Sequence, residues 1–287
     1  MSEFKIHECN LLAENIHEYW VEAPLIAVKH HAGQFVIVRS HDHGERIPLT
    51  VVGTDKERGL IRLIVQAAGK STIEMAELKA GDHFIDVVGP LGMATHIHNW
   101  GTMIAIAGGL GAAPLLPIIK AAKEAGNEVC GIIGARSKNL MILEDEFRDI
   151  CDELRICTDD GTYGDKGLVT DELQKWHDEG KHFDQAIIVG PIMMMKFTAL
   201  LTKKLEIPAM ASLNPIMVDG TGMCGACRVT VHGETKFACV DGPEFDAHGV
   251  DFDELNLRNQ AYRKQEKKAV EAWEAHRCNI GLTKGAN

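Results

Sequence analysis

The chain has 287 residues, 45% of them hydrophobic, and a formal net charge of −11 at pH 7. This length allows two domains with cores of their own and a smaller third one. The acidic balance, with no basic block before the tail, argues against nucleic acids and anionic membrane surfaces as partners.

The start of the chain, Met1 to Ile6, is polar and lacks the apolar segment of a signal peptide, and no apolar run is long enough to span a bilayer. The eight cysteines, at positions 9, 130, 151, 157, 224, 227, 239 and 278, do not have the compact spacing of a disulfide framework. We therefore expect a cytoplasmic protein with reduced thiols.

Short apolar segments alternate with turns rich in glycine, aspartate and histidine over residues 1–98. This spacing predicts an antiparallel β barrel. The stretch from Arg46 to Thr50 is notable because it puts a permanent cation, a rigid proline and a hydroxyl at the start of a strand. The expected strands are 20–23, 35–39, 50–53, 60–65 and 83–88.

A glycine-led turn, Gly69 to Thr72, follows the fourth of these strands. It opens an expected helix that ends at Leu78. The free N–H groups of a helix start, with Lys70 beside them, form a candidate phosphate site. An ordinary capped helix is the alternative, as a surface arginine is for Arg46. A P-loop is not favoured, because Ile64 stands where its first glycine is required.

Residues 99–210 change to alternating apolar strands and helices, which is the pattern of a doubly wound parallel sheet. The expected strands are 102–107, 128–134, 154–158 and 185–189, and the expected helices end at 125, 152, 179 and 205.

Glycines at the ends of these strands mark a candidate dinucleotide site. Gly108, Gly109 and Gly111 let the backbone approach a pyrophosphate at the start of a helix, and Gly190-Pro191 forms a second turn after the last strand. The first turn lacks the G-x-G-x-x-G form, so a plain tight loop is the alternative. Arg136 and Lys138 follow the second strand, where an adenine ribose would lie, and either could receive a 2′-phosphate. No acidic residue stands there, so the pattern does not decide between NAD and NADP.

Residues 211–250 contain Asp219, Cys224, Cys227 and Cys239. The plant-type [2Fe–2S] signature is C-x4-C-x2-C with a distant fourth cysteine, and Asp219 has the place of the first. A strand, a turn and a returning strand are expected after Cys227, and such a hairpin would bring Cys239 back beside the pair. A zinc site that adds His232 and three unrelated structural thiols are the alternatives, and Asp219 would then only form a turn.

Residues 251–287 are expected to be mostly helical from Glu254 onward, with Tyr262, Ala269, Val270 and Trp273 on one side. Two interpretations stay open: a solvated helix that lies on its own domain, and a docking helix for a partner chain. Cys278 is interpreted as a plain thiol.

The order of these features resembles the ferredoxin–NADP reductase superfamily, and Gly89 to Gly92 extends the resemblance to nearly the whole chain. The resemblance is closer to the electron-transfer subunits of dihydroorotate dehydrogenase and sulfide dehydrogenase. It is closer still to the small subunits of electron-bifurcating NADH-dependent ferredoxin:NADP oxidoreductases. The dihydroorotate-type subunits have four cysteines, so Asp219 favours the last group.

The resemblance implies three cofactors: FAD on the barrel, NAD(H) on the α/β domain and a [2Fe–2S] cluster on the hairpin. It places Thr50, the one catalytic position, near the flavin N5. The implied FAD-binding residues are Arg46, Pro48, Leu49, Thr50, Gly69, Lys70, Ser71 and Thr72. The implied dinucleotide-binding residues are Gly108, Gly109, Gly111, Ala112, Arg136, Gly190 and Pro191. The implied cluster ligands are Asp219, Cys224, Cys227 and Cys239.

The function implied is that of an electron-transfer flavoprotein subunit. NADH would give a hydride to FAD, and electrons would pass singly through the cluster to a large flavoprotein/iron–sulfur partner subunit, which would handle ferredoxin. One flavin that feeds one cluster leaves bifurcation to the partner. One alternative is the electron-transfer subunit of a dihydroorotate or sulfide dehydrogenase. The others are a zinc-stapled scaffold subunit without redox function and a self-sufficient reductase that needs no partner.

Overall fold

The computed structural model describes residues 4–279, with side chains up to residue 275. The end of the expected tail, residues 280–287, and the Cys278 side chain lie outside the described residues. Within residues 4–279, no helix is long and apolar enough to cross a membrane.

The N-terminal part is the expected antiparallel barrel, with strand order β6-β1-β2-β5-β4-β3-β7. A single residue, Ile85, separates the two edge strands, so one continuous segment pairs with β1 at one end and with β3 at the other and nearly closes the barrel. Alternate residues such as Tyr19, Val36 and Leu63 fill its interior. The strands are β1 (Phe4–Ala13), β2 (Ile16–Glu22), β3 (Phe35–Arg39), β4 (Ile47–Asp55), β5 (Leu60–Gln66), β6 (His83–Phe84) and β7 (Asp86–Leu91), and the helices are α1 (Pro24–Lys29) and α2 (Lys70–Met75).

The second part is the expected doubly wound sheet, with strand order β11-β10-β9-β8-β12-β13-β16. All pairs are parallel except β13 with β16. Its strands are β8 (Thr102–Gly108), β9 (Glu128–Ala135), β10 (Glu153–Thr158), β11 (Asp165–Lys166), β12 (Gln185–Val189), β13 (Ala209–Ser212) and β16 (Glu244–Asp246). Its helices are α3 (Ala112–Glu124), α4 (Glu144–Ile150), α5 (Val169–Asp178) and α6 (Ile192–Lys204). Side chains of α3 and α4 pack on one face and those of α5 and α6 on the other.

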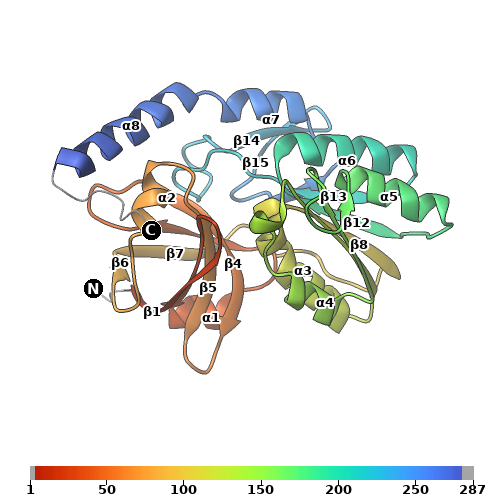
Figure 1. Cartoon of the computed structure of the whole chain (residues 1–287), viewed down its shortest axis with the longest axis horizontal. Helices are drawn as coiled ribbons and strands as arrows, with labels where there is room; N and C mark the ends of the chain where they lie inside the picture. The colour runs from red at the N-terminus through yellow and green to blue at the C-terminus, as the bar shows by residue number, and fades with distance from the viewer. Residues whose placement is uncertain (1–3, 280–287) are drawn as a thin grey trace.

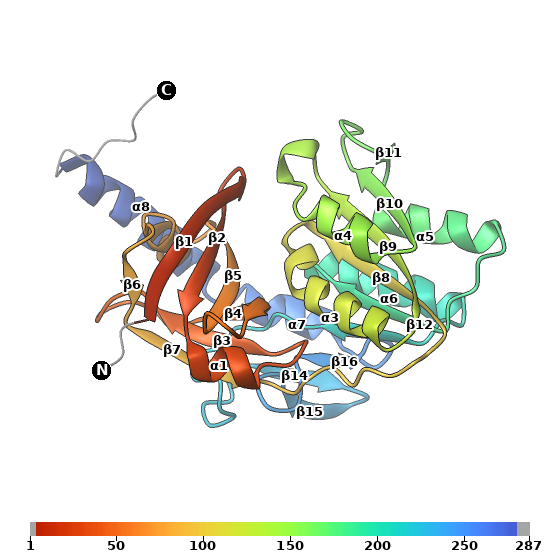
Figure 2. The ribbon, with the colours of Figure 1, turned by 90° about the horizontal axis from the view of Figure 1, so that it is seen from below.

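The C-terminal part joins the other two. The hairpin of β14 (Arg228–Val231) and β15 (Glu234–Phe237) shares one core with Phe35 and Ile37 of the barrel and with residues of β12 and β13. Figure 2 shows the hairpin beneath both larger domains. β16 lies in the range expected for the hairpin subdomain, yet it completes the edge of the α/β sheet.

The tail forms two helices, α7 (Phe252–Asn259) and α8 (Arg263–Asn279). α7 packs on α6 and β14, whereas α8 extends to α2 on the barrel side (Figure 1). Ala269, Val270 and Trp273 are half-buried, as expected for the side of α8 that faces the protein, but Tyr262 is exposed. The tail therefore lies on its own chain. Its outer side is compatible with both a solvated helix and a docking helix for a partner.

An ionic contact joins the barrel to the α/β domain. Arg62 of β5 binds Glu18 of β2 through Nε at 2.6 Å and chelates Glu146 of α4 through its two terminal nitrogens at 2.7 and 2.8 Å. Glu18 is only 6% exposed. Beside this contact, Val52 and Ile64 of the barrel pack against apolar residues of α3. The two domains are therefore held together by both apolar and ionic contacts.

Glu244 of β16 is half-buried, with a buried carboxyl oxygen, where the barrel, the linker after β7 and the sheet edge meet. Its Oε1 accepts a 2.7 Å hydrogen bond from the Thr95 hydroxyl, and its Oε2 is buried with no hydrogen-bond partner in the described part of the chain. Gly33 packs closely against the same two residues, since a Cβ on Gly33 would lie 2.3 Å from the Thr95 hydroxyl oxygen. Burial raises the pKa of Glu244 to about 7, although the Thr95 hydrogen bond acts in the opposite direction.

This carboxyl group should make the stability of the protein depend on pH. Its folded-state pKa of about 7 lies above the usual 4.5, so the folded protein binds more protons than the unfolded chain between these two values. The contribution of Glu244 to stability is complete below pH 4.5 and is lost as pH rises through 7. The loss amounts to about 3 kcal/mol.

Urea denaturation between about pH 5 and pH 8 measures this loss. Glu244→Gln, which stays neutral, should flatten the decline in unfolding free energy, whereas the control Glu57→Gln at an exposed position should keep the wild-type profile. A decline of equal slope in the wild type and in Glu244→Gln would contradict the assignment.

Candidate cofactor sites

The two glycine turns meet at the carboxyl edge of the α/β sheet. β8 and β12 are neighbours, and the strand order reverses between them, which is where α/β folds bind ligands. A Cβ on Gly111 would lie 2.2 Å from the carbonyl oxygen of Val189, and one on Gly190 would lie 3.1 Å from the Cα of Gly108. The turns therefore touch backbone to backbone, and side chains at these glycines would force them apart.

The start of α3 is open toward this edge. Gly109 has φ +53°, and no atom lies within 4 Å of where its Cβ would be, so its backbone faces free space. Ala112 begins the 13-residue helix α3 and is buried. Pro191 precedes α6. The first N–H groups of α3 and the open face of Gly109 are suited to a pyrophosphate.

Arg136 directly follows β9 and its side chain is exposed. Its guanidinium has no hydrogen bond or ion pair to a described residue. Lys138, two residues on, lies 4.9 Å above the ring of Tyr163 and is thus held away from this position. Arg136 is the cation available where an adenine ribose would lie.

The arginine motif forms the start of β4. Thr50 pairs with Phe35 and Pro48 with Ile37 of β3. Leu49 points into the barrel core, so Pro48 and Thr50, one residue to either side, share the opposite and half-buried face. This alternation presents a proline ring and a hydroxyl together on the outside of the barrel.

The turn at Gly69 is compatible with both interpretations, a capped helix and a phosphate site. The Thr72 hydroxyl oxygen accepts hydrogen bonds from the N–H groups of Ala68 and Gly69 at 3.0 Å, so the helix is capped. Lys70 pairs with Glu74 at 3.2 Å, and the buried Ser71 hydroxyl donates to Glu45. The space around Gly69 is open, with no atom within 4 Å of a Cβ there. Capping therefore leaves room for a phosphate beside Lys70.

Residues 218–227, here called the cluster loop, and Cys239 form the candidate cluster site. Cys227 and Cys239 are buried and their thiols are hydrogen-bonded, whereas Cys224 is exposed. Burial, followed by the contact with Cys227, raises the pKa of the Cys239 thiol to about 12. A bound metal would have to displace these protons, as metal binding to cysteine does. Gly220, Gly222 and Gly225 all have positive φ, and the N–H of Gly222 faces the Cys239 sulfur.

Asp219 lies on the same loop, and its charge acts on Cys239. Its carboxylate accepts hydrogen bonds from the Thr221 N–H at 3.1 Å, the Thr221 hydroxyl at 2.7 Å and the Met223 N–H at 3.2 Å. These bonds lower the pKa of Asp219, the Thr221 side chain first. The carboxylate is thus kept ionised, as a metal ligand must be.

The zinc alternative with His232 does not hold. His232 lies at the tip of the hairpin, beyond the whole length of β14 from Cys227, and its Nε2 binds Asp246 at 2.7 Å. Within the described residues, Glu128, Cys130 and Glu153 bring three ligand atoms within 4.8 Å of one another, whereas the residues of the cluster loop do not. A two-iron cluster divides its four ligands between two metal ions, so it tolerates this wider spacing.

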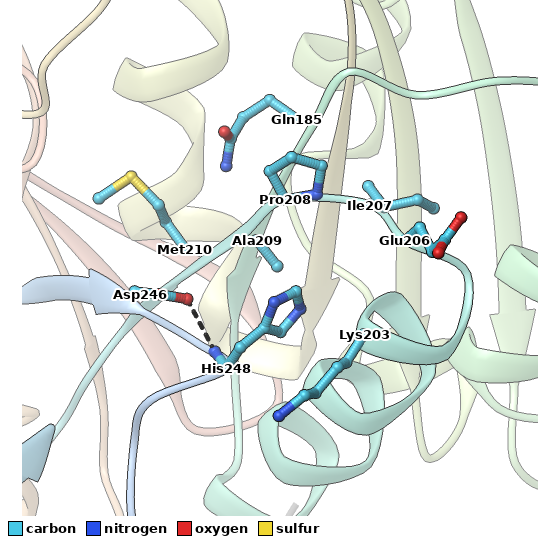
Figure 3. A pocket seen from close by; sticks show the side chains of 9 residues that line it. All are labelled: Gln185, Lys203, Glu206, Ile207, Pro208, Ala209, Met210, Asp246 and His248. Carbon is cyan, nitrogen blue, oxygen red and sulfur yellow. Dashed lines mark hydrogen bonds between the residues drawn. The ribbon is translucent and has the colours of Figure 1, made fainter. Parts of the chain in front are cut away.

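One cavity lies away from these sites. It has a volume of 470 Å³ and adjoins Gln185 at the start of β12 and Pro208 just before β13, so it lies at the amino edge of the sheet. Figure 3 shows His248 and Lys203 among the residues that line it, with the His248 N–H bound to Asp246. The nucleotide turns are at the opposite edge.

Sequence reasoning missed two residues that matter for the sites. Glu45, which holds Ser71, stands in a polar turn without any pattern. The contact of Gly220 with Ile37 and Leu91 of the barrel has no local signal in the sequence.

Two family models match the chain: the iron–sulfur cluster binding domain of dihydroorotate dehydrogenase B, over residues 214–251, and the oxidoreductase NAD-binding domain, over residues 105–199. The chain is 51% identical to a dihydroorotate dehydrogenase B (NAD(+)) electron transfer subunit homolog of Thermotoga maritima, over 91% of this chain and 92% of that protein.

Two solved structures extend these matches. One, from work on flavin-based electron bifurcation by the NADH-dependent reduced ferredoxin-NADP oxidoreductase, is 48% identical with a TM-score of 0.90 and covers 95% of this chain and 98% of its own. A ferredoxin NADP+ reductase from Neisseria gonorrhoeae with bound FAD and NADP, 15% identical, shares the fold with a TM-score of 0.59 over 71% of this chain and 90% of its own.

These matches agree with the geometry. The chain is an oxidoreductase subunit with an FAD-type barrel, an NAD-binding domain and an iron–sulfur domain, so the non-redox scaffold alternative is set aside. The chain belongs to the family of the electron transfer subunits of dihydroorotate dehydrogenase B and their homologues.

Proposed function

We propose that the chain is the electron-transfer subunit of an electron-bifurcating NADH-dependent ferredoxin:NADP oxidoreductase. The observation that carries this proposal is the cluster loop, in which Asp219 replaces the first cysteine of the plant-type signature and keeps its spacing. The likeness to the bifurcating oxidoreductase, at 48% identity, supports it. The partner is a larger flavoprotein/iron–sulfur subunit, and ferredoxin is reached only through that partner.

The α/β domain binds NAD(H). Gly108, Gly109 and Gly111 admit the pyrophosphate, and the first N–H groups of α3 stabilise its charge. Gly190 and Pro191 form the neighbouring turn, against which the first turn packs. Arg136 binds near the adenine ribose.

The barrel binds FAD. Arg46 and Lys70 supply positive charge to its phosphates, with the N–H groups at the start of α2. Pro48 and Thr50 lie along the flavin ring, and the Thr50 hydroxyl can donate a hydrogen bond near the flavin N5. Leu49 anchors the strand from inside the barrel.

The hairpin subdomain holds the [2Fe–2S] cluster through Asp219, Cys224, Cys227 and Cys239. Bound FAD supplies the chemistry that converts a hydride from NADH into single electrons for the cluster. The residues of the chain contribute orientation and exclusion of water, since hydride transfer needs no acid or base. Exposed Cys224 places one ligand at the surface, toward the partner.

A second function, the electron-transfer subunit of a dihydroorotate dehydrogenase, is favoured by the relative from Thermotoga maritima and its printed name. The two functions share the path from NADH to the cluster and differ in the partner. Assays of the complex therefore decide between them.

The test uses the chain purified alone and in complex with its native partner, under anaerobic conditions. NADH should reduce both the flavin and the cluster of the isolated chain. The complex should oxidise NADH and reduced ferredoxin together while it reduces NADP. Oxidation of dihydroorotate by the complex would favour the second function. Rapid NADH-driven ferredoxin reduction by the isolated chain would instead indicate a self-sufficient reductase.

A further inference from the structure

The Arg46 side chain reaches the cluster loop, although the two are 172 residues apart in sequence. Its Nε donates a 3.0 Å hydrogen bond to the backbone carbonyl of Val218, and its Nη2 lies 3.4 Å from the carbonyl oxygen of Asp219. The same residue directly precedes β4, the strand that carries Pro48 to Thr50. Arg46 thus contacts the backbone of the first proposed cluster ligand.

The next residue of the loop, Gly220, packs closely against the barrel. Gly220 has φ +81°, and a Cβ on it would lie 2.9 Å from Ile37 Cγ1 and 2.9 Å from Leu91 Cδ1. Those side chains belong to the neighbouring strands β3 and β7. The segment 218–220 therefore contacts the barrel both through apolar side chains and through the Arg46 guanidinium.

The side chain of Asp219 is fixed as well, but by its own loop. Its carboxylate is bound to the Thr221 hydroxyl and to the N–H groups of Thr221 and Met223. The loop therefore fixes the position of this carboxylate. The contacts of Arg46 and Gly220 fix the loop on the barrel.

A guanidinium has enough donors for two tasks. Arginine carries five N–H donors in one plane, and the two contacts with the loop use two of them. The remaining donors can bind a phosphate group in the charge-assisted manner typical of arginine. A lysine at this position would have a single ammonium group and could not span both partners.

We propose that Arg46 is a positioning residue for the iron–sulfur cluster, in addition to any contact that it makes with FAD. It fixes the backbone at Val218 and Asp219 on the flavin-binding barrel and so sets where the first ligand stands. This inference rests on the proposed function, because it takes the cluster loop to hold iron. Hydrogen bonds to the groups that carry a metal ligand orient that ligand and tune the metal.

Arg46→Ala and Arg46→Lys test the proposal in the full-length chain. Each should change the electron paramagnetic resonance (EPR) signal of the reduced cluster and shift its midpoint potential. Each should also release iron to a chelator about 10-fold faster than the wild type. The reference is the wild type stripped of its flavin, since loss of FAD alone should leave these three readouts unchanged.

Gly220→Ala tests the same positioning without altering any residue proposed to bind FAD. The added methyl group would meet Ile37 and Leu91 and lift the segment from the barrel, so the EPR signal should change as it does in Arg46→Ala. Gly233→Ala is the matched control, because Gly233 also has a positive φ of 78° but has no atom within 4 Å of a Cβ. Its cluster should be that of the wild type.

The outcomes separate the two proposals. If Arg46→Ala matches the flavin-stripped wild type, and Gly220→Ala matches Gly233→Ala, Arg46 does not position the cluster. If the variants fold with wild-type circular dichroism but lose iron, the positioning role is supported. If the wild type itself never shows a [2Fe–2S] signal, the proposed function is wrong, and this inference is overturned with it.

Discussion

Replacement of Arg62 by alanine should lower the free energy of unfolding by about 3–5 kcal/mol, which is the usual cost of breaking a buried ion pair. The change leaves the Glu18 carboxylate, 6% exposed, without the cation that compensates its charge. It also removes the bidentate contact with Glu146 on α4, so the barrel and the α/β domain lose their ionic link.

Arg58→Ala is the control, since the side chains of Arg58 and its partner Glu8 are 53% and 43% exposed on the same barrel and are 2.9 Å apart. Exposed pairs contribute at most about 1 kcal/mol. Urea denaturation followed by tryptophan fluorescence measures both variants. A similar and small loss in the two would mean that the Arg62 contact does not stabilise the interface.

Gly111→Ala should slow NADH-driven reduction of the flavin by about 100-fold, as expected when a bound reactant is displaced by about 1 Å. The φ of Gly111, −58°, suits any residue, so the effect comes from contact alone. The methyl carbon would lie 2.2 Å from the Val189 carbonyl oxygen and 2.6 Å from its carbon. Because both atoms are backbone, the turn after β8 and the end of β12 would have to separate.

Gly180→Ala is the matched control for Gly111→Ala. Gly180 ends α5 with φ +85° and open space around it, so an alanine there costs only backbone strain of about 1–2 kcal/mol. Stopped-flow mixing with NADH should give the wild-type rate for this variant. A wild-type rate in Gly111→Ala as well would place the dinucleotide elsewhere.

Local pattern predicted most of the α/β domain because its strands are buried on both faces. The run from Ile104 to Ala107 is fully buried and reads as continuous apolar sequence. β1 was missed for the opposite reason, since of its ten residues only Ile6 is buried. β13 and β16 are short edge elements, and β16 became recognisable only through its pairing with β13.

The residues of the candidate site were predicted from the sequence, but the contacts between its domains were not. Motif spacing indicated Arg46, the glycine turns and the cluster ligands, yet it could not show that Arg46 meets Val218 or that Gly220 rests on Ile37. Such contacts depend on how three domains pack, and no local propensity encodes them. The same holds for Glu244, an ordinary glutamate in sequence whose burial comes from Thr95 and Gly33.

The central claim is that this chain carries flavin and an iron–sulfur cluster with Asp219 as a ligand. The most direct test is a visible and EPR spectrum of the purified chain before and after dithionite, with Asp219→Cys measured in parallel. We predict a flavin band and a reduced [2Fe–2S] signal that changes in Asp219→Cys, because thiolate and carboxylate differ as ligands. A fully loaded preparation with zinc and neither flavin nor iron would contradict the account, and an unchanged signal in Asp219→Cys would remove Asp219 from the cluster.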